Sequence, residues 1–126
     1  VILGQPEQCT IGVLSRRLLE AEGLFEKVRD QNVVAEMPTS AMLVPNIVTG
    51  AADAALVYVT DAQAEREKLE IIDIDSPLAK AVQPYGVANS SEHSQLGGRL
   101  LEAISRSRDQ FQSRGFEWQL DAHDEP

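Results

Sequence analysis

The sequence has few of the residues that build disulfides, metal sites and membrane spans. It contains one cysteine, Cys9, so no disulfide can form within the chain and a cysteine-based metal site is excluded. Its two histidines, His93 and His123, lie too far apart to be paired zinc ligands on one helix. No apolar run approaches the roughly 18 residues of a membrane-spanning helix. We therefore expect neither a bound metal ion nor direct insertion into a membrane.

Positive charge is also scarce. Lysine and arginine number 11 against 20 aspartates and glutamates, which gives a net charge of −9. The basic residues are scattered, whereas nucleic-acid binding depends on a basic face that neutralises phosphates. We therefore do not expect nucleic acid as a partner. A small anion is not excluded, because backbone N–H groups at helix N-termini hold anions without any formal positive charge.

The length and composition predict one globular domain with an α/β fold. The chain has 126 residues, of which 43% are hydrophobic, enough for a single core. Strands and helices alternate, which predicts three layers, with a mostly parallel central sheet between helices. The predicted strands are 1–3, 33–35, 54–58, 69–74 and 84–88. The predicted helices are 10–22, 24–28, 39–50, 62–68, 93–105 and 108–113, and residues 119–126 are expected to form a frayed acidic tail.

The stretch 32–62 is the centre of this pattern, because it is predicted to form a strand, a helix and a second strand. Thr39 and Ser40 supply hydroxyls that can cap the helix, and Gly50 can end it. Pro45 requires the helix either to begin after Thr39 or to kink, since proline lacks the N–H of an interior helical residue. In a parallel sheet the turn from strand to helix lies at the carboxyl edge, where ligands bind.

Hydroxyl groups mark three such turns. Thr10, Ser40 and Tyr58 each lie at a predicted strand-to-helix transition, so we expect them at one edge of the sheet. Alternatively, Thr10, Thr39 and Ser40 are ordinary helix caps and Tyr58 is an aromatic residue that ends a strand. The two interpretations are compatible, because the N–H groups that a cap leaves free still face a ligand.

The sequence gives no catalytic pattern. The carboxylate pairs Asp61 with Glu65 and Asp73 with Asp75 lie on predicted solvated surfaces, and Ser40 has no histidine at a motif-like spacing. The pair Gly97 and Gly98 falls inside a predicted helix and lacks the remaining residues of a phosphate-binding loop. We therefore expect a binding protein without a cofactor rather than an enzyme.

Four segments together resemble a known family. They are LGQPEQCTIG at 3–12, LLEAEGLFEKV at 18–28, the run from AE to SAMLVPNIVTGAADAALVYVTDA at 35–62, and RGFEW at 114–118. In this order they resemble the second half of the periplasmic molybdate-binding proteins, the solute receptors of ABC importers with the two-lobed type 2 periplasmic-binding-protein fold. The resemblance covers nearly the whole chain.

The resemblance implies that the chain is the second lobe of such a receptor. A first lobe of comparable size then precedes it, and the tetrahedral oxyanion, molybdate or tungstate, is enclosed between the lobes. Residues 84–126 then form the strand and helices that return toward the first lobe. The implied partner is an ABC permease. The implied location is periplasmic or extracytoplasmic, either soluble or anchored by a lipid.

The resemblance also assigns ligand contacts. They fall on the backbone at Ile11 beside Thr10, on the helix start at Thr39 and Ser40, and on the hydroxyl of Tyr58 in the motif LVY. Ile11 stands where the family commonly has alanine, and Ser40 where it often has valine.

Two other functions fit the same fold. One is the effector-sensing lobe of a transcriptional regulator or other signalling protein, which a basic helix-turn-helix elsewhere in the full-length protein would indicate. The other is an interaction module with a degenerate site, which is suggested by Ile11, Pro38 and Pro45. Binding of no oxyanion by the two-lobed protein would favour the interaction module.

Overall fold

A computed structural model describes residues 1–120 of the chain. Its contacts group the chain into two compact units, Val1–Ala81 and Val82–Pro126, and each unit is described by itself. The last residues of the expected frayed tail, 121–126, lie outside the described part. The expectation that the whole chain forms one lobe therefore stays a prediction.

The first unit is built on two short parallel strands. Strand β1, Ile2–Gly4, pairs with β2, Ala35–Met37, so that Ile2 lies opposite Ala35 and Gly4 opposite Met37. A single bridge joins Ile2 to Ala55 on the other side of β1, where the Ile2 N–H donates to the Ala54 carbonyl at 2.9 Å. The extended segment 54–57 is thus the third member of a small parallel arrangement with β1 at its centre.

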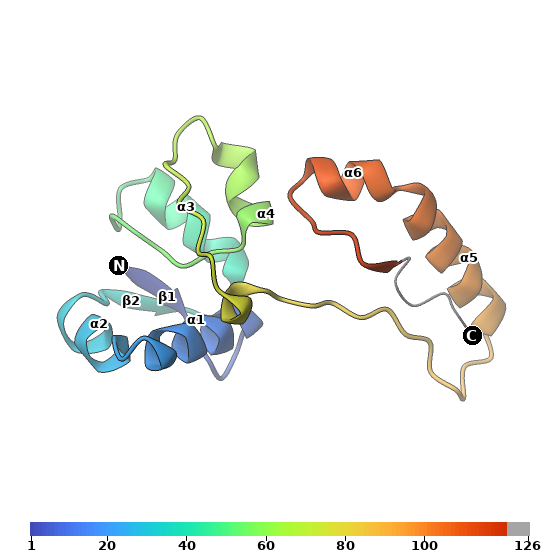
Figure 1. Cartoon of the computed structure of the whole chain (residues 1–126), viewed down its shortest axis with the longest axis horizontal. Coiled ribbons are helices and arrows are strands. Elements are labelled where there is room, and N and C mark those ends of the chain that lie inside the picture. The colour runs from blue at the N-terminus through green and yellow to red at the C-terminus, as the bar shows by residue number, and fades with distance from the viewer. Residues whose placement is uncertain (121–126) are drawn as a thin grey trace. The chain divides into compact units, whose positions relative to one another are not determined.

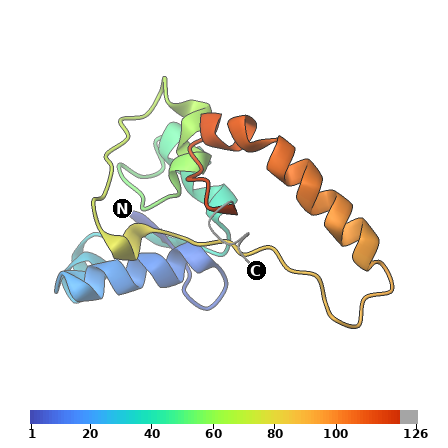
Figure 2. The same ribbon diagram turned by 45° about the vertical axis from the view of Figure 1, so that its right-hand side comes forward.

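Helices cover both faces of these strands. In Figures 1 and 2, helix α1, Thr10–Ala21, lies on one side of the strands, and α3, Leu43–Val48, lies on the other. Helix α2, Phe25–Gln31, follows α1, and α4, Val59–Ala62, follows the third extended segment. The short 3-10 helices are η1, Ser40–Met42, η2, Gln63–Glu65, and η3, Pro77–Ala79. The small sheet between helices agrees with the predicted α/β class.

The core of this unit joins the sheet to both helical layers. Ile2 of β1 and Leu43 of α3 are almost completely buried, and Ile11 of α1 packs with them. In α1 the buried positions 11, 15 and 18 are three or four residues apart, which is the spacing of one helical face. Gly23 and Gly50 follow their helices with φ of 66° and 76°, a conformation that glycine adopts without steric cost. These two predicted helix ends are confirmed.

Pro45 shows why the central helix begins late. It is the third residue of α3, in the first turn, where a residue's N–H has no partner within the helix. The residues before it form η1 instead. The first of the two predicted alternatives is therefore correct, and the helix begins after Thr39.

Up to residue 120, the second unit contains two helices and two segments that pack against them. Helix α5, Ser94–Arg106, and α6, Arg108–Ser113, agree with the predicted helices 93–105 and 108–113. The Tyr85 hydroxyl donates to the Gly97 carbonyl of α5 at 2.8 Å. The ring of Phe111 contacts Phe116 edge-on, with ring centroids 5.4 Å apart, and also contacts Trp118.

Two of the predicted strands are wrong and a third is only partly formed. Residues 69–74 and 84–88 form no strand in the described chain, and 54–58 forms only the single bridge to Ile2. A strand needs a partner to accept its hydrogen bonds, which an alternating pattern alone cannot provide. Ile72, for example, is 79% exposed. The segment with Tyr85 packs on α5 instead of pairing.

The charged helix predicted for 62–68 is also displaced. Helix α4 begins at Val59, three residues earlier, and Tyr58 occupies its N-cap position. Within residues 1–120, no helix has the length and apolarity to cross a bilayer. The same residues contain no cluster of three or more potential metal ligands.

Candidate functional site

Three chain segments turn from extended to helical structure at the same edge of the small sheet. Strand β1 leads to α1, its neighbour β2 leads to η1, and the segment bridged to β1 leads to α4. All run in parallel, so their carboxyl ends share one edge. The Gln5 N–H donates to the Met37 carbonyl at 2.8 Å and ties the first two turns together. We refer to the residues that begin these helices as the sheet-edge site: Cys9, Thr10, Ile11, Thr39, Ser40 and Tyr58.

The start of α1 presents two unbonded N–H groups. Across residues 1–120, the N–H groups of Thr10 and Ile11 donate to no other group, whereas those of Gly12 and Val13 bond to the Cys9 carbonyl. The Thr10 side chain is exposed, and the Ile11 side chain is buried in the core. At Ile11, therefore, only the backbone is available to the site. The family resemblance implied a backbone contact at this position.

The start of η1 also presents N–H groups without partners. The first N–H to be bonded is that of Met42, which donates to the Thr39 carbonyl at 3.3 Å. In the described chain, the N–H groups of Ser40 and Ala41 have no partner. The Thr39 side chain is exposed and Ser40 is half-buried, and neither hydroxyl makes a capping hydrogen bond. This turn thus adds two backbone donors and two hydroxyls.

Tyr58 brings a phenolic hydroxyl to the start of α4. Its ring packs against the core cluster, as do the side chains of Cys9 and Met37. Burial is the main cause that raises the pKa of Tyr58, and electrostatic interactions with Cys9 and Asp61 raise it further. The hydroxyl therefore remains a neutral O–H donor at physiological pH. Tyr58 and Cys9, the residue before α1, pack against the same core cluster.

The capping interpretation is wrong for the side chains. The N-cap of α1 is Cys9, not Thr10, and neither α1 nor η1 has a side-chain capping bond. At α1 the helix begins at Thr10 itself, so Thr10 is its first residue and not its cap. The hydroxyls of Thr10, Thr39 and Ser40 are thus not used by their own helices.

Cys9 is a small, partly buried side chain that packs against the core cluster, and sequence reasoning did not place it at the N-cap of α1. Its thiol lies 3.5 Å from the Gln5 carbonyl and 3.8 Å from the Met37 carbonyl, and so contacts both of the first two turns. The feature of the sequence that could have indicated this contact is the position of Cys9 directly before the predicted helix 10–22. Cys9 is half-buried and its thiol is free.

Gly4 and Gly12 allow the start of α1 to pack closely against the end of β1. A Cβ atom on Gly12 would lie 2.5 Å from the Gly4 carbonyl oxygen, and one on Gly4 would lie 2.8 Å from the Cys9 sulfur. Both distances are shorter than such contacts allow. The N-terminus of α1 therefore rests directly on the end of β1, which fixes where its free N–H groups lie.

Comparisons with known proteins give the family. No curated protein and no solved structure matches the chain. The family model of the bacterial extracellular solute-binding proteins matches residues 1–117, which include every residue of the sheet-edge site. The chain therefore belongs to the family of bacterial extracellular solute-binding proteins.

Proposed function

We propose that the sheet-edge site binds a tetrahedral oxyanion, molybdate or tungstate, as one half of the solute site of a receptor. The observation that carries this proposal is the set of unused hydrogen-bond donors at one edge. Four backbone N–H groups, of Thr10, Ile11, Ser40 and Ala41, lack partners in residues 1–120. An oxyanion accepts several such bonds at once, and free N–H groups at helix starts suit it without a positive side chain.

The side chains at the edge support the same ligand class. The hydroxyls of Thr10, Thr39 and Ser40 are free to donate, and the raised pKa of Tyr58 keeps its phenol protonated. The Ile11 side chain is buried in the core, which supports a contact through its backbone N–H alone.

The proposed receptor has a second lobe and a membrane partner. The site lies at an edge, so this chain supplies donors from one side of the ligand only. We propose that a first lobe supplies the others, that the lobes close over the anion, and that an ABC permease opens them for import. The periplasm or another extracytoplasmic space is the proposed location. No chemical step and no cofactor is required.

Calorimetric titration of the two-lobed receptor with molybdate, tungstate, sulfate and phosphate tests the proposal. We expect tight binding of molybdate and tungstate and weak or absent binding of the other two. The 126-residue chain alone should bind the same anions much more weakly, because half of the donors are missing. Absence of heat with all four anions in the two-lobed receptor would refute the oxyanion and leave the family assignment unchanged.

Substitution of Ser40 separates backbone from side-chain recognition. Ser40→Pro removes the N–H at the start of η1, a position where the proline ring is compatible with the fold. We expect it to weaken oxyanion binding by about 1.5–3 kcal/mol, the range for a hydrogen bond to a charged group. Ser40→Ala retains the N–H and should cost less. Equal losses in calorimetry would assign the contact to the hydroxyl alone.

The single thiol offers a chemical probe of the site. Cys9 lies at the start of α1 beside both turns, so bound oxyanion should cover it. We expect saturating molybdate to slow alkylation of Cys9 by iodoacetamide by about tenfold or more, as followed by mass spectrometry. Sulfate at the same ionic strength is the control. Identical alkylation rates in both salts would place the ligand away from Cys9.

A further inference from the structure

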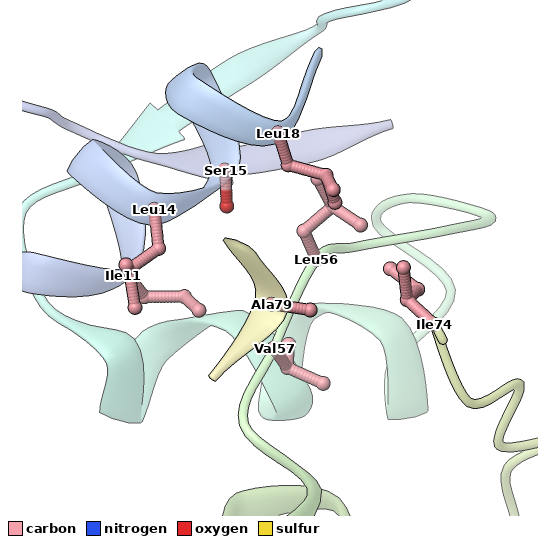
Figure 3. Close-up of a pocket in the computed structure, with 8 residues that line it drawn as sticks. All are labelled: Ile11, Leu14, Ser15, Leu18, Leu56, Val57, Ile74 and Ala79. Carbon is pink, nitrogen blue, oxygen red and sulfur yellow. The ribbon is translucent and has the colours of Figure 1, made fainter. Parts of the chain in front are cut away.

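We draw no further inference here: the strongest candidate, the cavity of about 50 Å³ between α1 and the third extended segment of the first unit (Figure 3), is half-open to solvent, and the hydroxyl oxygen of Ser15 in its lining has essentially no accessible surface with which to bond a ligand.

Discussion

Gly12→Ala is expected to destabilise the first unit and to disturb the sheet-edge site together. The new Cβ would lie 2.5 Å from the Gly4 carbonyl oxygen and 2.5 Å from the Gln5 carbonyl carbon, both of them backbone atoms that cannot rotate away. Relief requires α1 to move off β1. Overpacking of this kind costs about 3 kcal/mol, and the better helix propensity of alanine returns about 1 kcal/mol. We expect a net loss of about 2 kcal/mol in the free energy of unfolding, measured by urea denaturation.

Gly98→Ala is the matched control, because it makes the same substitution inside another helix. A Cβ at Gly98 of α5 meets no atom within 4 Å. The change should therefore raise the stability of that helix by about 0.5–1 kcal/mol. Since α1 also carries the Thr10 and Ile11 donors, Gly12→Ala should weaken oxyanion binding in the two-lobed receptor, whereas Gly98→Ala should not. A Gly12→Ala protein as stable as the wild type would show that α1 does not rest on β1 this closely.

The helices were predictable because their signals are local. The spacing of Ile11, Ser15 and Leu18 lies within one helix, and Gly23 ends that helix through its own backbone preference. Strands depend on partners that are distant in sequence. Residues 69–74 have the strand pattern, yet Ile72 lies largely in solvent, since no neighbouring strand pairs with it in the described chain. Local pattern thus predicted this α/β class better than it predicted the size of its sheet.

The sheet-edge site was predictable in position but not in its hydrogen bonds. The transitions at Thr10, Ser40 and Tyr58 follow from alternation of strand and helix, and the structure places them at one edge. Which hydroxyls would cap their helices could not be predicted, because a shift of one residue moves Thr10 from the cap into the helix. The Cys9 thiol contacts the carbonyl of Met37, which is 28 residues away in sequence, and no local pattern predicts that contact.

Tyr58→Phe is expected to weaken oxyanion binding by about 1.5–3 kcal/mol, the range for loss of a hydrogen bond to a charged group. The substitution retains the ring that packs against the core and removes only the hydroxyl. Calorimetry on the two-lobed receptor measures the change. Tyr85→Phe is the control: its hydroxyl bonds to the Gly97 carbonyl in the second unit, so its loss should cost about 1 kcal/mol of stability and no affinity.

The alkaline pH dependence gives an independent test of the same hydroxyl. Below its pKa, Tyr58 is a neutral donor, and above it the phenolate repels a bound dianion. Burial raises that pKa above the usual value of about 10, and a bound anion raises it further. Affinity of the wild-type receptor should therefore hold through neutral pH and fall only above about pH 10. Tyr58→Phe should lack this decrease, and an identical alkaline profile in both proteins would remove Tyr58 from the site.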